Sequence, residues 1–232
     1  MKIKLLSILL FGYLMSSAQK VDYTAYSKLL NQYVNESGKV DYANLKTNQR
    51  ELNKIIADFE KQDVWKLTRS EDQLAFCINV YNANTLKLIV DHYPIKSITD
   101  LDNGKPWDIK RVKGAAQLFS LNQIENEIIR PIFKDPRVHF ALNCAAISCP
   151  PLFNKVFLPD ELNNQLEART KKFIQSTIKQ DKTGKIIISK IFEWYKTDFG
   201  DVISFINKYS INHYPMNEAI QYQEYDWKLN EK

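Results

Sequence analysis

The stretch LAFCINVYNANTLKLIVDHYP, residues 74–94, contains most of the longest helix that the sequence predicts. Ser70, with Gln73 three residues later, predicts a capping box at its start. Tyr93-Pro94 predicts its end, because the residue before a proline is pushed out of the helical region. At 100° per residue one stripe of this helix is apolar: it holds Leu74, Ala75, Ile78, Leu86 and Ile89. A helix over residues 71–92, with one face buried, is therefore predicted.

Two asparagines interrupt this apolar stripe. Asn82 falls in its middle, and Asn79 lies one turn earlier at its edge. A buried amide without partners costs about 1–3 kcal/mol, so both need polar neighbours. Either they satisfy backbone groups of a neighbouring strand or loop, or they line a site and orient a reacting group. Both interpretations predict a polar partner in the interior, and residues 139–149 are the best candidate. Cys77 falls off the stripe, which predicts a small core residue.

That partner stretch is HFALNCAAISCPP, residues 139–151, which combines a histidine with two cysteines. A nucleophilic thiol needs a base or a positive group to hold it as thiolate, and His139 is the obvious partner of Cys144. Residues 137–143 have the pattern of a strand, on which five steps span about 16 Å and place the two residues on opposite faces. The pair meets only if the chain doubles back near Asn143.

Such a reversal is predicted by the residues that follow. Residues 145–147 can form one helical turn capped by Asn143, with Cys144 in the first turn, where the helix dipole lowers a thiol pKa. Pro150 and Pro151 end that turn. Cys149 or Ser148 then returns toward the end of the strand.

The same residues allow two other interpretations. Cys144 and Cys149 can form a disulfide, or they can bind zinc together with His139. The spacing of four residues is loose for zinc, and there is no second close Cys/His pair. We therefore predict no metal and no cofactor. His92 and His213, each in a His-Tyr-Pro stretch at a predicted helix end, stay open as alternative bases.

The N-terminus has the pattern of a cleaved secretory signal. Lys2 and Lys4 precede an apolar run over residues 5–15, and Ser16 and Ala18 are small residues in front of a cut before Gln19. The run is shorter than the roughly 20 residues of a membrane span. We expect an exported protein, periplasmic or extracellular, with residues 1–18 removed, residues 19–232 as one globular domain, and no stable membrane insertion after cleavage.

Charge and cysteine content narrow the class of protein. The net charge falls from +5 to +3 when Lys2 and Lys4 are removed, and no dense basic stripe with aromatic residues is present, which argues against nucleic acid. An unknown small-molecule or peptide ligand is the expected partner. Three cysteines cannot build a disulfide framework, and an exported chain of this size can fold on its core.

The order of elements predicts an α+β fold: a single helix-rich domain with short β-hairpins and a small sheet. Helices are predicted at 21–34, 42–59, 71–92, 121–132, 159–177, 192–195 and 202–209. Hairpins are predicted around Gly114 and across residues 181–184, a strand at 137–143, and an extended tail at 220–227.

Two stretches together resemble a family catalogued as domain of unknown function 547: LAFCINVYNANTLKLIVDHYP and DPRVHFALNCAAISCPPL. SLNQIENEIIRPIF, FEWYKTDFG and YDWKLN are similar to stretches of that family as well. The positions that match its pattern are Asn79, Tyr81, Asn82, His139, Asn143, Cys144, Ser148, Cys149 and Pro150. Cys77 departs from it, since the family more often has tryptophan there, which favours a packing role. The resemblance implies candidate positions and no settled activity.

Two functions compete at this stage. In the first, the protein is a thiol-dependent hydrolase or acyl-transfer enzyme in which Cys144 attacks the substrate. His139 is the base or orients it, Asn143, Asn79 or Asn82 donates to the developing oxyanion, and Tyr81 closes the pocket, with Ser148 and Cys149 beside it. In the second, the protein is a non-catalytic secreted binding or structural domain, and a Cys144–Cys149 disulfide holds its binding surface.

Overall fold

The computed structural model describes residues 20–115 and 117–232, so the predicted signal segment lies outside the described residues. The α-helices are α1 (Thr24–Tyr33), α2 (Tyr42–Thr47), α3 (Gln49–Glu60), α4 (Ser70–His92), α5 (Leu121–Gln123), α6 (Arg130–Phe133), α7 (Leu162–Thr177), α8 (Ile191–Trp194), α9 (Lys196–Phe199) and α10 (Val202–Tyr209). A π-helical segment, Ile124–Ile129, joins α5 to α6. Short 3₁₀ helices are η1 (Val64–Lys66), η2 (Ile98–Asp100), η3 (Asp102–Gly104), η4 (Pro106–Asp108), η6 (Pro136–Phe140) and η7 (Pro159–Glu161). The predicted helix-rich α+β class is confirmed.

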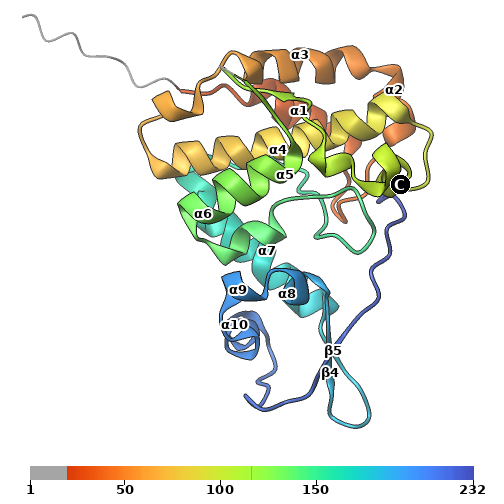
Figure 1. Cartoon of the computed structure of the whole chain (residues 1–232), viewed down its shortest axis with the longest axis vertical. Helices are drawn as coiled ribbons and strands as arrows, with labels where there is room; N and C mark the ends of the chain where they lie inside the picture. Colours follow the sequence, from red (N-terminus) through yellow and green to blue (C-terminus); the bar gives the residue numbers. More distant parts are fainter. Residues whose placement is uncertain (1–19, 116) are drawn as a thin grey trace, which may run out of the picture.

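Two small sheets complete the fold. β1 (Val112–Lys113) and β2 (Leu118–Phe119) form an antiparallel hairpin. β3 (Lys179–Gln180) pairs antiparallel with β4 (Ile186–Ile188), and β4 pairs parallel with β5 (Ile220–Tyr222). Both predicted hairpins are therefore present, and the predicted extended tail begins as β5. In Figure 1, α3 and α4 cross one end of the molecule, and α8, α10, β4 and β5 occupy the other.

Helix α4 is buried on nearly all sides. It packs against α2, α3 and the π-helical segment, so the predicted apolar stripe is only part of its buried surface. Phe76, Cys77, Tyr81, Leu88 and Val90 are buried in addition. Cys77 is thus a core residue, and burial raises the pKa of its thiol to about 12.

The predicted capping box of α4 is wrong. The helix begins at Ser70, and no side chain caps it. Gln73 instead donates its amide to the carbonyl oxygen of Leu67 at 2.9 Å. Arg69 precedes the helix and pairs with Asp72 in its first turn, with 2.8 Å between Nε and Oδ2. The long predicted helix over residues 42–59 is also divided, into α2 and α3, at Asn48.

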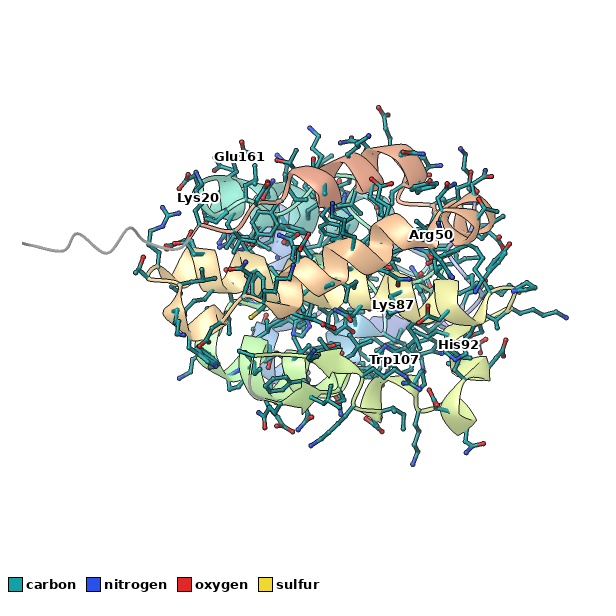
Figure 2. All side chains as sticks on the ribbon, turned by 90° about the horizontal axis from the view of Figure 1, so that it is seen from above. Lys20, Arg50, Lys87, His92, Trp107 and Glu161 are labelled. Atoms are coloured by element: carbon teal, nitrogen blue, oxygen red, sulfur yellow. The ribbon has the colours of Figure 1, made fainter. Side chains whose placement is uncertain are left out.

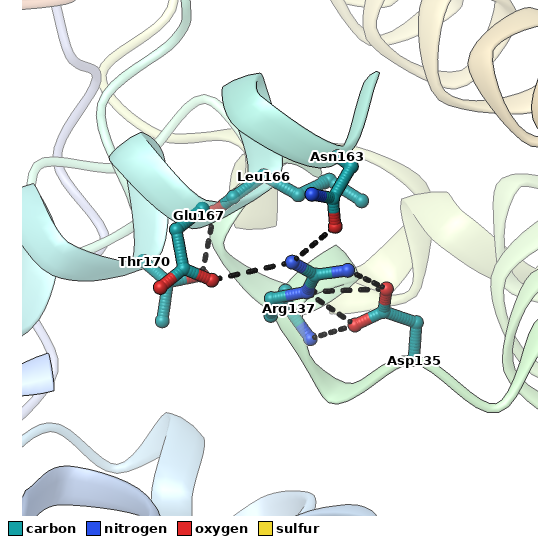
Figure 3. Close-up of polar contacts among 6 residues, drawn as sticks. All are labelled: Asp135, Arg137, Asn163, Leu166, Glu167 and Thr170. Carbon is teal, nitrogen blue, oxygen red and sulfur yellow. Dashed lines mark hydrogen bonds and ion pairs between the residues drawn. The ribbon is translucent and has the colours of Figure 1, made fainter. Parts of the chain in front are cut away.

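The predicted strand over residues 137–143 is wrong as well, because η6 occupies this place. Asp135 caps η6 by accepting the backbone N–H of Arg137 at 3.0 Å, and Pro136 is its first residue. Arg137 also pairs with the Asp135 carboxylate and reaches Asn163 and Glu167 on α7 (Figure 3). These contacts hold η6 on α7, and they favour the coiled backbone over an extended one.

The chain after β5 runs back along the whole molecule. The C-terminus lies near α2, at the opposite end from β5 (Figure 1). On its way the tail binds the backbone of three separate segments. Ile147 donates to the carbonyl of Lys228 at 2.8 Å, Leu229 donates to Lys96 at 3.0 Å, and Val40 donates to Asn230 at 2.9 Å. The tail therefore fixes the loop that contains both cysteines of the predicted site.

Candidate functional site

A cavity of about 310 Å³ lies where η4, the π-helical segment, the cysteine loop over residues 142–150, α8 and the tail meet. Its volume is at the lower end of the range for small-molecule sites. The lining residues are Tyr81, Trp107, Asp108, Asn122, Glu125, Asn126, His139, Leu142, Cys144, Cys149, Pro150, Ile191, Trp194, Tyr195, Tyr225 and Trp227. Of the predicted site residues, this cavity brings together Tyr81, His139, Cys144 and Cys149.

Asn143 fixes the start of the cysteine loop. Its backbone N–H donates to Oδ1 of Asn82 at 2.9 Å, and its amide donates to the carbonyl of Pro150 at 2.9 Å. Its own Oδ1 accepts the N–H of Ala145 at 3.0 Å, which is an Asx turn. Ala145 has a φ of +61°, so the predicted helical turn over residues 145–147 is wrong. The helix dipole is therefore not what acts on Cys144.

Cys144 lies partly exposed in the cavity wall. Its Sγ is 3.3 Å from the hydroxyl of Tyr225. Burial opposes ionisation of this thiol, but hydrogen bonds from Cys149, from Tyr225 and from the backbone of Ala146 outweigh it and lower the pKa of Cys144. Burial raises the pKa of Tyr225 far above its ordinary value, so its hydroxyl keeps the proton that it donates. Cys144 is the thiol in this structure that is prepared for ionisation.

Cys149 is hydrogen-bonded to the backbone of Cys144. Its Sγ accepts the backbone N–H of Cys144 at 2.9 Å, and the thiol faces the carbonyl of Leu142 at 3.8 Å. Burial and the neighbouring Cys144 raise the pKa of Cys149 well above its ordinary value. The pKa values of the two thiols are thus shifted in opposite directions: that of Cys144 is lowered and that of Cys149 is raised. Cys144, Cys149 and Cys77 are all free thiols in the structure.

Ser148 hydrogen-bonds the tail next to Tyr225. Its hydroxyl accepts the N–H of Asp226 at 2.9 Å, and its own N–H donates to the carbonyl of Asp226 at 3.2 Å. Ser148 does not line the cavity of Cys144. It lines a separate hollow of about 200 Å³.

His139 is a buried member of the cavity wall. Its Nε2 lies 2.8 Å from Oδ2 of Asp198, and its ring stacks on Tyr195 with 3.9 Å between centroids. Arg130 binds the same carboxylate with two nitrogens, at 2.6 and 2.8 Å. Arg130 and His139 are therefore joined through Asp198.

The charges of this group follow from burial and pairing. Burial lowers the pKa of His139 to about 4, and hydrogen bonds from Arg130 lower the pKa of Asp198 to about 2. At neutral pH the imidazole is neutral, and its Nε2 carries the proton that Asp198 accepts. The hydrogen-bond partner of the Cys144 sulfur is Tyr225, whereas that of His139 is Asp198. His139 thus shares a cavity with Cys144 without a hydrogen bond to it among the described residues.

Glu125 lines the cavity although it is not among the predicted site residues. It lies in the π-helical segment with 8% of its surface exposed, and Tyr81 donates its hydroxyl to Oε2 at 3.2 Å. Burial raises the pKa of this carboxyl, although hydrogen bonds from Tyr195 and Tyr81 oppose the shift. π-Helical turns are frequent at functional sites because they change which side chains face a cavity.

The asparagines of α4 bind backbone rather than the cavity. Asn79 donates to the carbonyl of Phe157 at 2.8 Å and accepts its N–H at 3.0 Å. Asn82 donates to Ala141 at 2.9 Å and accepts from Asn143. The predicted interior partner of Asn82 is thus the cysteine loop, as the sequence indicates, whereas the partner of Asn79 is the segment before η7.

Several further lining residues come from distant parts of the chain. Glu125, Tyr195, Tyr225 and Trp227 all lie in the three shorter stretches that carry the resemblance. The resemblance of those stretches was therefore the sequence signal that could have identified these lining residues, although their spacing does not indicate that they meet at Cys144.

The described residues offer two further negative findings. Over residues 20–115 and 117–232, no cluster of three or more histidine, cysteine, aspartate or glutamate side chains is arranged to bind a metal ion. No helix in the same part of the chain is long and apolar enough to cross a membrane.

A larger cleft, of about 890 Å³, lies elsewhere in the molecule. Lys20 and Glu161 are among its lining residues, and Figure 2 shows them together, well apart from Trp107 of the cysteine cavity. No cysteine or histidine is among the described residues that line it. Cys144 and His139 line the smaller cavity instead.

Comparison with known proteins assigns a family to the middle of the chain. Residues 65–174 match the family described as "Protein of unknown function, DUF547". This range contains α4, Glu125, His139 and the cysteine loop, but it ends before Tyr195, Asp198 and Tyr225. No curated protein and no solved structure matches the chain.

Proposed function

Residues 65–174 belong to the family of unknown function DUF547, and we propose from the cavity that this chain is an exported thiol-dependent hydrolase or acyl-transfer enzyme with Cys144 as its nucleophile. The observation that carries the proposal is the environment of Cys144. Its thiol lines a cavity, its pKa is lowered, and a protonated tyrosine hydroxyl lies 3.3 Å from its sulfur. A low-pKa, accessible thiol in a cavity is what nucleophilic catalysis requires.

The first step is attack of the Cys144 thiolate on a carbonyl carbon. A C–S bond forms, and the carbonyl π electrons move to oxygen. Tyr225, which held the thiolate, is placed to donate to the oxyanion as the charge moves from sulfur to oxygen. The side-chain amides of Asn79, Asn82 and Asn143 already donate to backbone carbonyls, which favours Tyr225 for this role.

The second step is release of the leaving group. The carbonyl re-forms, the bond to the leaving group breaks, and that group takes its electron pair and a proton. Glu125 is the proposed donor, because burial raises the pKa of its carboxyl and so favours the protonated form. A water molecule or another nucleophile then attacks the thioester carbon and gives its proton to the Glu125 carboxylate. The C–S bond breaks, which releases the acyl product and restores the Cys144 thiolate. His139 and Asp198 are proposed to orient Tyr195 beside Glu125.

Alkylation kinetics test this proposal. Native protein is treated with iodoacetamide over pH 5–10, and the modified cysteine is identified by mass spectrometry before and after reduction. We expect fast modification of Cys144, with a midpoint below that of an ordinary thiol, and no modification of Cys77, the buried control. Equal slow reaction of Cys144 and Cys77 would exclude a prepared nucleophile.

A second candidate function rests on the proximity of the two loop cysteines. The backbone N–H of Cys144 contacts Sγ of Cys149 at 2.9 Å, but the two sulfurs are free and not at disulfide distance in the structure. A disulfide that serves a non-catalytic binding domain in an oxidising compartment therefore requires the cysteine loop to rearrange. In the same experiment this candidate predicts that neither Cys144 nor Cys149 reacts until the protein is reduced.

A further inference from the structure

The cavity of Cys144 has an aromatic wall built from distant segments. Trp227 lies 5.5 Å from Trp107, 5.9 Å from Trp194 and 4.6 Å from Tyr225, measured between ring centroids. Three of the four tryptophans of the chain therefore meet at this one cavity. Trp194 keeps 46% of its surface exposed, so the wall is open to a ligand rather than closed as core.

The charged groups that line this cavity are acidic. Asp108 lies exposed on η4 at the rim, held by the amide of Asn122 at 3.0 Å, and Glu125 lies deeper. No lysine or arginine is among the described lining residues. The guanidinium of Arg130 lies over the ring of Tyr195, 4.9 Å from its centroid, and is paired with the Asp198 carboxylate.

Electron-rich aromatic faces and carboxylates together are how proteins bind organic cations. Tryptophan gives the strongest cation–π attraction, and a nearby carboxylate adds Coulomb attraction without a basic group to cancel it. An anionic substrate would meet the like charge of Asp108 here. From this wall and these charges we infer that the cavity binds the cationic group of a small organic ammonium compound, a primary amine or a quaternary ammonium. The inference deepens the proposed function and rests on it for the reaction, but binding itself needs no chemistry at Cys144.

The test is titration of the intact protein with matched probes. Choline and n-butylammonium are the cations, 3,3-dimethylbutan-1-ol is the uncharged isostere of choline, and glucose is the neutral ligand that also stacks on tryptophan. Because three of the four tryptophans line the cavity, intrinsic fluorescence reports occupancy, and calorimetry checks the stoichiometry. We expect at least one cation to bind at one site, with a Kd roughly tenfold or more below that of the isostere.

Two variants and a control locate that binding. Trp194→Ala and Asp108→Asn should each weaken the cation about fivefold or more, whereas Trp65→Ala, which removes an exposed tryptophan outside the cavity, should not. Equal binding of choline and its isostere, binding of glucose alone, or no saturation by either cation overturns the inference. If no cation binds but Cys144 is reactive, the proposed enzyme stands and the cation site is refuted. If cations bind but Cys144 is inert, the cation site stands and the proposed enzyme is refuted.

Discussion

At the scale of single residues, the preparation of Cys144 is a matter of hydrogen bonds. Burial works against its thiolate, and no cationic side chain touches the sulfur among the described residues. The donors that overcome burial are the Cys149 thiol, the Tyr225 hydroxyl and a backbone N–H. A thiol prepared in this way should respond to removal of one hydroxyl group.

Replacing Tyr225 with phenylalanine should slow alkylation of Cys144. The change removes the donor 3.3 Å from Sγ and keeps the ring in the aromatic wall. We expect the thiol pKa to rise, which lowers the alkylation rate near neutral pH up to about tenfold. The measurement is the pH profile of iodoacetamide alkylation. Tyr222→Phe, on β5 of the same tail, is the matched control, and an equal effect of both variants would contradict the role of Tyr225.

His139 makes the stability of the fold depend on pH. Its folded-state pKa is lowered by burial from 6.5 to about 4. Between these pH values the unfolded chain binds a proton that the folded chain does not. The free energy of unfolding therefore has its full value above about pH 6.5 and decreases as the pH falls toward 4. The full shift corresponds to a loss of about 3 kcal/mol.

Urea unfolding at pH 7 and pH 4.5 measures that dependence. His139→Gln should lose much of the decrease, because glutamine does not titrate and can still donate to Asp198. His213→Gln, at an exposed position, should keep it. Other titrating groups, Glu125 among them, are common to all three proteins and cancel in the comparison. An unchanged pH dependence in His139→Gln contradicts the assignment.

At the scale of elements, hydrophobic periodicity predicts most of the helices. The predictions that fail do so at the ends of elements, where local helix-start signals determine the structure. Alternation over residues 137–143 indicates a strand, yet Asp135-Pro136 just before it is a start signal for a helical turn, and that signal prevails. Ser70 and Gln73 look like a capping box, but the helix starts one residue earlier than such a box requires. The π-helical widening that turns Glu125 toward the cavity has no sequence pattern of its own.

Asp135→Ala should destabilise η6 and its attachment to α7. The substitution removes the cap on the N–H of Arg137 and one ion-pair partner of its guanidinium. We expect the free energy of unfolding in urea to fall by about 1–2 kcal/mol. Asp160→Ala removes only a surface ion pair with Arg69 and should change it by less than about 0.5 kcal/mol. Equal effects of the two variants would show that the cap contributes nothing.

At the scale of the whole molecule, part of the site was predictable and part was not. The segment with His139, Asn143, Cys144 and Cys149 contains nucleophile chemistry in adjacent residues, so its composition alone identifies it. Glu125, Tyr195 and Tyr225 reach the cavity only through tertiary packing, and a single sequence holds no record of that long-range convergence. Composition therefore predicted which segment holds the candidate thiol, and only the fold shows which residues of other segments surround it.

Export is a prediction about the whole chain, and it has a direct measurement. If residues 1–18 are a cleaved signal, the protein recovered from outside the cytoplasm should begin at Gln19, and its intact mass should lack those residues. Lys2→Glu with Lys4→Glu should reduce export of the chain, whereas Lys20→Glu, beyond the cut, should not. A recovered protein that retains residue 1 would contradict cleavage.

The tail that returns from β5 also determines when, during synthesis, the Cys144 thiol gains its hydrogen-bond donor. Tyr225 follows Cys144 by some eighty positions, and Lys228 closes the backbone hydrogen bond to the cysteine loop. A chain that emerges from a ribosome or a translocation channel in sequence order has Cys144 outside well before it has Tyr225. During that interval the thiol lacks a donor that lowers its pKa, and it stays close to an unactivated cysteine. On the proposed function, the nascent chain therefore holds no activated nucleophile until synthesis has passed residue 228.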